Sequence, residues 1–138
     1  MGRIMAIDYG TKRVGIAVTD PMQIIASPLD TVHSKDIVDF IVNYAKTEEL
    51  DCVVVGWPTK LDSSDTNNTQ NVQAFVNRLK KMISLPIHLE DERFTSKIAM
   101  QAMISAGSKK KDRAKKGNID KVSAAVILQS YMERTKGF

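Results

Sequence analysis

The chain has 138 residues, of which 43% are hydrophobic and 26% are charged. These values are ordinary for a folded soluble protein and predict one domain rather than a disordered chain. A single cysteine excludes an internal disulfide bond, and no apolar run approaches the ~20 residues that a membrane-spanning helix needs.

The net charge of +4 is mild, but it is distributed unevenly along the chain. Six bases and one acid lie between Lys109 and Gly117, which gives this segment alone a net charge of +5. The rest of the chain is therefore close to neutral. A basic segment of this kind is typical of a contact with a polyanion such as nucleic acid, although a solvated loop can have the same composition.

The first part of the chain predicts three strands joined by short links. Apolar runs at 4–7 and 14–19 predict two strands, and the short link between them predicts an antiparallel hairpin. Residues 24–29 lead into a third strand at Thr31-Val32. Pro28 indicates that part of this strand is a sheet edge or a bulge, because proline cannot donate to a strand ladder.

The middle of the chain predicts two helices with a strand between them. The first helix opens at residues 34–36, and its apolar residues recur at helical spacing: Ile37, Phe40, Ile41, Tyr44 and Ala45. The continuous apolar run 50–57 is typical of a strand buried on both faces of a parallel sheet. Polar residues 59–71 predict a loop. The second helix then has the apolar stripe Val72, Phe75, Val76, Leu79 and Met82.

The last part of the chain predicts one strand and two helices. A short strand at 85–89 runs into the acidic stretch 90–93, and a helix follows from residue 95 or 96 to 104. After the basic segment, a very apolar helix is predicted over 119–132. Strands that each follow a helix should add in parallel to the first three. The predicted fold is therefore α/β, with a mixed five-stranded sheet flanked by helices.

Four acids are predicted to converge at one edge of this sheet. Asp8 ends the first strand, Asp91 and Glu92 end the last strand, and Asp120 opens the final helix. Open α/β sheets bind ligands at the carboxyl ends of their parallel strands. Carboxylates grouped there suit Mg²⁺ or Mn²⁺. Two such ions about 4 Å apart can stabilise the attacking and leaving oxygens of phosphodiester hydrolysis.

Each of these acids also has a plainer interpretation, which is weakest for Asp8. Asp120 taken alone is better explained as a helix N-terminal acid stabilised by the macrodipole. The stretch 90–93 could be a solvated turn with a local ion pair. His88 and His33 are more simply an exposed strand residue and a turn residue than metal ligands.

The loop at residues 10–13 suits a phosphate group, since it offers backbone N–H groups, a hydroxyl and two bases. A plain hairpin turn can have the same composition. Trp57 could stack on a base or cover the core, and the core is favoured. The predicted nucleic-acid contacts are Thr11, Lys12, Arg93, Lys109, Lys110, Lys111, Arg113, Lys115 and Lys116.

Four motifs follow one another in a characteristic order: Asp8-Tyr9-Gly10-Thr11-Lys12, Gly56-Trp57-Pro58, Asp91-Glu92-Arg93-Phe94-Thr95, and Lys116-Gly117-Asn118-Ile119-Asp120 followed by Ser123-Ala124-Ala125. At these spacings they resemble the YqgF/RuvX family of Holliday-junction resolvases and pre-16S ribosomal RNA nucleases. The resemblance runs from about residue 3 to about residue 134.

This resemblance implies a ribonuclease H-like fold and a Mg²⁺- or Mn²⁺-dependent nuclease of the bacterial cytoplasm. It implies a role in maturing the 5′ end of pre-16S ribosomal RNA, with Holliday-junction DNA as the other substrate. The family's acids fall on Asp8, the pair Asp91-Glu92, and Asp120. Neighbouring strand residues point to opposite faces, so one of the pair is expected to reach the metal, and which one stays open. Related resolving enzymes carry a further acid where this chain has Gly117, so three carboxylates are expected.

Two other functions stay open at this stage. The motif at 8–12 also resembles the phosphate loop of the actin, sugar-kinase and acetate-kinase group, which places nucleotide between two such domains, whereas 138 residues supply one. A non-enzymatic RNA-binding factor could use the basic segment and a degenerate site. Symmetric cleavage of two strands usually needs a two-fold dimer, and no dimer signal is found. A monomer or weak homodimer without membrane contact is therefore expected.

Overall fold

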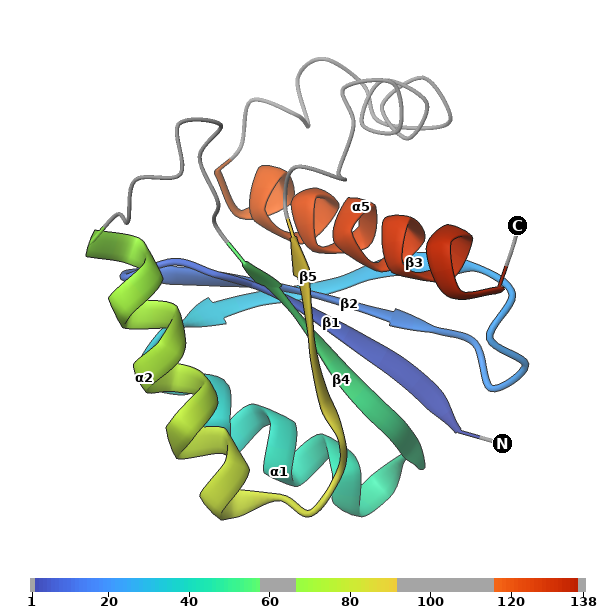
Figure 1. Cartoon of the computed structure of the whole chain (residues 1–138), viewed down its shortest axis with the longest axis horizontal. Helices are drawn as coiled ribbons and strands as arrows, with labels where there is room; N and C mark the ends of the chain where they lie inside the picture. Colours follow the sequence, from blue (N-terminus) through green and yellow to red (C-terminus); the bar gives the residue numbers. More distant parts are fainter. Residues whose placement is uncertain (1, 58–66, 92–115, 137–138) are drawn as a thin grey trace.

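The computed structural model contains a five-stranded sheet with helices on both faces (Figure 1). It describes residues 2–57, 67–91 and 116–136, with the backbone alone for 67, 68, 116–120 and 136. Its elements are β1 (Arg3–Tyr9), β2 (Arg13–Thr19), β3 (Ala26–His33), α1 (Ile37–Thr47), β4 (Leu50–Trp57), α2 (Asn67–Met82), β5 (Ile87–Asp91) and α5 (Lys116–Lys136).

The strand order β3-β2-β1-β4-β5 confirms the predicted mixed sheet. β1, β2 and β3 form an antiparallel meander, and β4 and β5 add in parallel beyond β1. β3 is an edge strand, and its pairing with β2 shifts register between Ile16 and Ala17, where Ala17 pairs with Pro28. The predicted edge and bulge at this proline are therefore both present.

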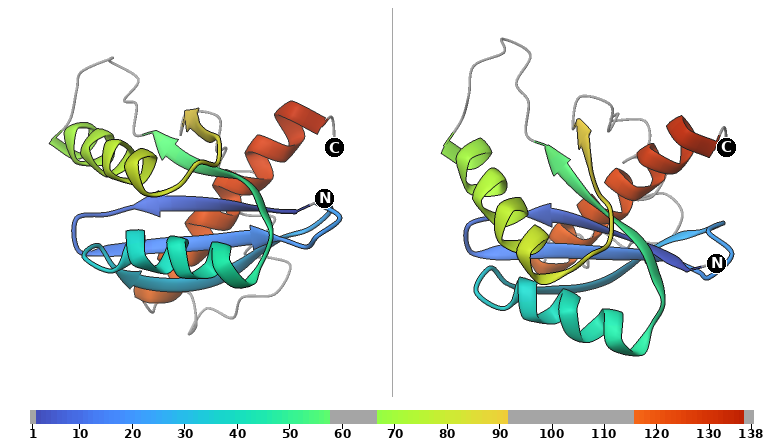
Figure 2. Two further views of the ribbon diagram at one scale, coloured as in Figure 1. Left: turned by 90° about the horizontal axis from the view of Figure 1, so that it is seen from below. Right: turned by 60° about the horizontal axis from the view of Figure 1, so that its bottom comes forward.

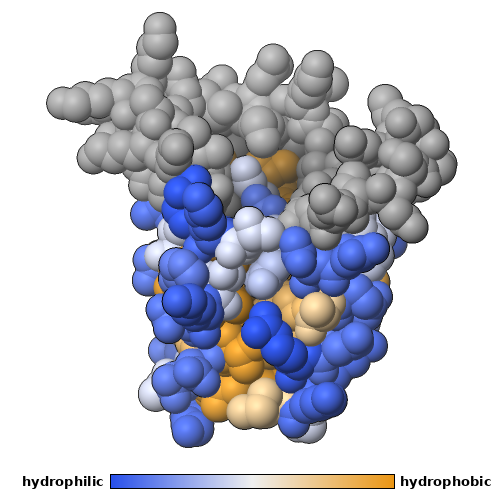
Figure 3. All heavy atoms as spheres, turned by 90° about the vertical axis from the view of Figure 1, so that its left-hand side faces the viewer, coloured by the Kyte–Doolittle hydropathy of each residue, from blue (hydrophilic) through white to orange (hydrophobic). Residues whose placement is uncertain are grey.

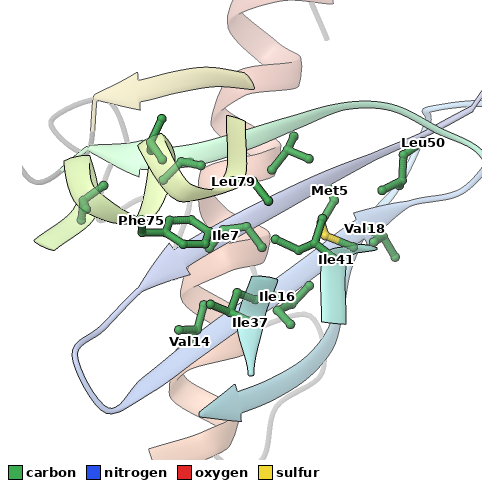
Figure 4. Close-up of a cluster of buried hydrophobic side chains, with 14 residues drawn as sticks. Met5, Ile7, Val14, Ile16, Val18, Ile37, Ile41, Leu50, Phe75 and Leu79 are labelled. Carbon is green, nitrogen blue, oxygen red and sulfur yellow. The ribbon is translucent and has the colours of Figure 1, made fainter. Parts of the chain in front are cut away.

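Helices α1 and α2 cover one face of the sheet, and α5 covers the other (Figures 1 and 2). Large aliphatic side chains and Phe75 fill the α1/α2 side (Figure 4). The α5 side is built from smaller residues of the helix and of the strands that it crosses, including Ala6, Ala17, Ala124 and Ala125. Alternate residues of each strand thus supply two separate cores.

Four predicted boundaries or placements are wrong in detail. The polar stretch to residue 71 is not all loop, because α2 begins at Asn67. Met82, expected in the apolar stripe of α2, is 55% exposed at the last helical position. β5 runs from Ile87 to Asp91 rather than over 85–89. α5 begins at Lys116, so the helix includes the end of the predicted basic loop. The helix predicted over 95–104 lies outside the described residues.

The surface on the α2 side is mainly hydrophilic. Figure 3 shows hydrophilic side chains on either side of an exposed apolar strip on this face. In the part of the chain that the structure describes, no helix is long and apolar enough to cross a membrane.

Candidate functional site

The carboxyl ends of β1, β4 and β5 meet at one edge of the sheet, and two of the predicted acids lie there. Asp8 is the penultimate residue of β1 and is half-buried. Asp91 is the last residue of β5, where it pairs with Trp57 at the end of β4. The structure therefore brings Asp8 and Asp91 to the predicted edge, with β4 between their strands.

Asp8 and Asp91 nevertheless belong to opposite faces of the sheet. On β1, Tyr9 stacks on Phe75 of α2 with ring centroids 4.7 Å apart, so alternation along the strand turns Asp8 to the α5 side. On β5, Glu90 bonds to α5, so the same alternation turns Asp91 to the α1/α2 side. Asp91 thus shares an edge with Asp8 but not a face.

The remaining predicted site residues are described in part or not at all. Asp120 is the fifth residue of α5, which begins at Lys116, so the prediction that Asp120 opens this helix is wrong. The helix covers the face to which Asp8 belongs. The side chains of Asp120 and Lys116 are outside the described set, as are Glu92, Arg93 and residues 109–115 entirely. Among the side chains that are described, no three of His, Cys, Asp or Glu lie close enough together to hold a metal ion.

Glu90 has a structural role beside this edge that the sequence did not predict. Its side chain is 0% exposed. Its carboxylate accepts hydrogen bonds from Ser130 Oγ at 3.1 Å, from Arg134 Nε at 3.2 Å, and from Arg134 Nη2. The alternative of a solvated turn is therefore wrong for Glu90, which instead ties β5 to α5. The polar pair Ser130 and Arg134, four residues apart on an apolar helix, is the sequence signal that could have revealed it.

A stacking contact between two aromatic side chains adds to the hydrogen bonds between β5 and α5. His88 of β5 is exposed, as predicted, and stacks on Tyr131 of α5 with centroids 5.8 Å apart. Hydrogen bonding to the Glu90 carboxylate raises the pKa of Arg134, so this guanidinium stays charged. Burial, with Cys52 as a neighbour, raises the pKa of Tyr131. Near neutral pH Arg134 is charged and Tyr131 is neutral at this contact, as they would be with their ordinary pKa values.

The hairpin loop beside Asp8 has a fixed shape. A side chain at Gly10 would place its Cβ 2.4 Å from the carbonyl oxygen of Arg13, so the tight turn requires glycine. Thr11 and Lys12 are exposed at the same edge of the sheet, where they were predicted to contact phosphate. Trp57 is half-buried and packs against the core on the α1/α2 side, which confirms the favoured interpretation.

The strand order β3-β2-β1-β4-β5, with helices on both faces, defines the class of fold, which is ribonuclease H-like. The structure is similar to Thermus thermophilus RuvC in complex with a Holliday junction substrate, with a TM-score of 0.63, 13% identity, and coverage of 98% of this chain and 97% of that chain. It is also similar to the Fowlpox virus resolvase in complex with Holliday junction DNA, with a TM-score of 0.55, 14% identity, and coverage of 96% and 97%. At these identities the likeness concerns the fold.

The chain belongs to the RuvX family, because the family model described as Holliday junction resolvase matches residues 2–134. A relative from Phocaeicola vulgatus named "Putative pre-16S rRNA nuclease" is 48% identical over 137 residues, which cover 99% of both chains. A relative of the same name from Amoebophilus asiaticus is 47% identical over 137 residues, with 99% of this chain and 97% of that protein covered. The predicted family, fold and nuclease class are thus confirmed.

Proposed function

We propose that this chain is a single-domain, divalent-metal-dependent endonuclease that processes the 5′ end of pre-16S ribosomal RNA in the bacterial cytoplasm. Four-way junction DNA is the second candidate substrate. The observation that carries the proposal is Asp8, a half-buried carboxylate at a rigid strand end, on the face covered by α5. The RuvX family match and the names of the relatives support the type of substrate.

The donor chemistry at this edge fits Mg²⁺ or Mn²⁺, which prefer carboxylate oxygens and keep water ligands. Asp8, Asp120 and one of Asp91 and Glu92 would hold the cation. When bound, the cation would supply charge stabilisation to the phosphodiester oxygens and lower the pKa of an attacking water. The chain's own groups hold the strand ends rigid and orient the carboxylates. We propose a monomer or weak homodimer as the working state.

The alternation along β5 favours Glu92 over Asp91 as the third ligand. His88 and Glu90 lie on the α5 side with Asp8, and Glu92 has the same parity in the sequence, whereas Asp91 has the opposite one. We therefore expect Glu92→Gln to lower cleavage more strongly than Asp91→Asn. Equal losses, or a larger loss for Asp91→Asn, would reverse this assignment.

The exposed hairpin loop and the basic segment are proposed to hold substrate phosphates. Thr11 and Lys12 are exposed next to the strand that carries Asp8. The positive charges of the basic segment would offset the repulsion between the acidic edge and a nucleic-acid backbone. They would also favour binding, because cations that neutralise phosphates release counterions. The members of this set outside the described residues are Arg93 and the bases of 109–115, and they keep the role predicted from the sequence.

The central test is cleavage by Asp8→Asn. Precursor 16S RNA and a four-way DNA junction are incubated with Mg²⁺ or Mn²⁺, and we expect a rate loss of at least about 100-fold, since metal charge stabilisation contributes several kcal/mol. Asp39→Asn, which changes an exposed acid of α1, is the matched control and should keep its rate. Unchanged cleavage by Asp8→Asn would refute the assignment. RNA binding by the wild type without any metal-dependent cleavage would instead support a non-catalytic RNA-binding factor.

A further inference from the structure

The same sheet edge continues past β1 to the start of β2 and the end of β3, where two loops meet. β1 and β3 both run antiparallel to β2, so the end of β3 lies at the edge that carries Asp8. Arg13, the first residue of β2, pairs with His33, the last residue of β3. The hairpin loop 10–13 and the loop 33–36 are therefore direct neighbours.

Ser34 locks these two loops together. It is buried, its backbone N–H donates to the carbonyl oxygen of Lys12 at 3.2 Å, and its Oγ donates to the carbonyl oxygen of Thr11 at 2.6 Å. The second loop is fixed internally as well, because the backbone N–H of Lys35 donates to His33 Nδ1 at 3.0 Å. The hydroxyl and the backbone N–H of Ser34 each donate to one carbonyl of the hairpin loop, so this buried residue holds the two loops in a fixed relative position.

Basic and donor side chains cover the solvent side of this locked pair of loops. Lys12, Arg13, His33 and Lys35 are all exposed, and we name these four residues the basic platform. Because Nδ1 of His33 accepts a hydrogen bond, a neutral ring carries its proton on Nε2 and so offers one more donor. The exposed acid Asp36 follows directly and offsets one of the three permanent charges.

The basic platform begins beside Asp8 and leads away from β5. Asp8 pairs with Gly15, so Arg13 is its diagonal neighbour on the same face, and such neighbours lie about 7–8 Å apart. His33 belongs to the same face one strand further, since cross-strand partners share a face. Adjacent strands are spaced about 4.8 Å apart. The platform thus spans a region roughly 5–10 Å from the strand of Asp8, which suits phosphates next to the one cleaved.

We propose that the basic platform binds the phosphate backbone of the nucleic-acid substrate beside the scissile phosphate, and that Ser34 is its positioning residue. The proposal extends the predicted phosphate loop 10–13 to His33 and Lys35 of the neighbouring loop. It rests on the proposed function only in requiring a nucleic-acid substrate. Phosphate contacts from bases and from loop donors fix the register of a nucleic acid without reading its sequence.

Binding without cleavage tests the platform separately from catalysis. The affinity for a labelled four-way DNA junction and for a precursor-RNA hairpin is measured in EDTA over a series of salt concentrations. For Lys35→Gln we expect several-fold weaker binding and a slope of log K against log salt that is smaller by about 0.7 to 0.9, the value for one lost phosphate contact. Lys12→Gln/Lys35→Gln should lower the slope by about twice as much.

The matched control is Lys46→Gln, because Lys46 is an exposed lysine in the last turn of α1, away from this edge. If Lys35→Gln and Lys46→Gln have the same slope, the platform is overturned. That result would leave the proposed nuclease activity standing. A wild type that binds with the expected slopes but never cleaves would refute the nuclease and keep the platform.

Ser34→Ala tests the positioning role, because it keeps every charge of the platform. We expect the dissociation constant for the junction to rise several-fold while the melting temperature falls by only a few degrees. Ser34→Thr, which restores a hydroxyl, should recover most of the affinity. Wild-type affinity of Ser34→Ala would overturn the role of Ser34. A folded Ser34→Thr protein that binds as weakly as Ser34→Ala would also overturn it.

Discussion

Different kinds of side chain pack on the two faces of the sheet. The α1/α2 side is filled by large apolar side chains such as Met5, Ile16, Phe75 and Leu79. The α5 side has alanines where the helix crosses the strands, and polar contacts where it meets β5. An alanine adds nothing beyond Cβ, so a helix can lie close to a sheet that is lined with alanines.

The two faces therefore have different roles: the α1/α2 side mainly stabilises the fold, and the α5 side mainly determines where α5 lies along the sheet. Among the residues that the structure describes, most of the largest fully buried apolar side chains lie on the α1/α2 side, and we expect their burial to supply the larger share of the hydrophobic free energy of folding. On the α5 side, the close approach and the Glu90 contacts fix how the helix sits along the sheet. Asp8 and the backbone of Asp120 both belong to this second side. The acids Asp8 and Asp120 therefore lie on the side where the Glu90 contacts hold α5 in place.

The largest expected effect is on the α1/α2 side. Phe75→Ala removes a side chain that is fully buried and stacked on Tyr9, and we expect the free energy of unfolding to fall by about 3–5 kcal/mol. Met82→Ala, at an exposed position of the same helix, should cost less than about 1 kcal/mol. Urea denaturation measures both. Similar losses for the two variants would show that this core does not carry the stability.

The next largest effect concerns the ion pair between Glu90 of β5 and Arg134 of α5, because replacing one partner should cost more stability than replacing the other. Glu90 is fully buried, whereas the Arg134 side chain is 49% exposed. Arg134→Ala leaves a buried carboxylate without its cation and should cost about 2–4 kcal/mol. Glu90→Gln leaves an arginine that water can solvate and should cost about 1–2 kcal/mol. Adding Glu90→Gln to Arg134→Ala should recover stability, and a double variant as unstable as the sum of the two would contradict this account.

A smaller effect is expected where α5 packs closest. Ala125→Leu inserts three carbons into a fully buried contact, and we expect a loss of about 1–3 kcal/mol with a further loss of cleavage as the helix moves outward. Ala74→Leu, at an exposed position of α2, should change stability by no more than about 0.5 kcal/mol. Thermal unfolding compares the two. If Ala125→Leu is neutral in both stability and cleavage, close approach is not required.

The smallest effect concerns the turn that leads into β3. The Asp20 carboxylate accepts hydrogen bonds from the backbone N–H groups of Ile25, Ile24 and Met22 at 2.8, 2.9 and 3.1 Å, and these bonds lower its pKa below the ordinary value of 3.8. Asp20 therefore contributes its full stabilisation above about pH 4 and loses it as the pH falls through the lowered pKa.

Acid titration checks this contribution. Asp20→Asn should flatten the fall in stability below about pH 4, with Asp39→Asn as a control at an exposed acid of α1. Ala26, at the start of β3, packs on the α5 side, so hydrogen exchange should show that acid loosens this side first. Uniform loosening of both faces would contradict the coupling.

The sequence predicted the sheet well because periodicity reports burial. The apolar run 50–57 is β4 to the residue, and Pro28 marks an edge strand and a bulge. The start of α2 at Asn67 was missed, since polar residues that suit a loop also form a first helical turn once the following stripe is packed. Packing against the sheet decides such cases, and local composition does not contain it.

The shared edge of Asp8 and Asp91 was predicted from the sequence, but the face of the sheet to which each side chain belongs was not. The face of the sheet to which the Asp91 side chain points depends on the register of β5, which the sequence left open. Glu90 was missed because its partners Ser130 and Arg134 are 40 or more residues away in the chain. Contacts of that range arise from the fold as a whole.

The single cysteine of the chain sits where it can report on the α5 side. Cys52 is buried in β4 within the cluster that α5 covers, and Cys52 and Tyr131 of α5 line the same open pocket of about 350 Å³. Movement of the helix off the strand should expose the thiol further, so a change in the labelling rate between variants reports a change in that opening. A comparison of wild type with Arg134→Ala would show how strongly Arg134 holds α5 on the sheet, and no cysteine would have to be introduced.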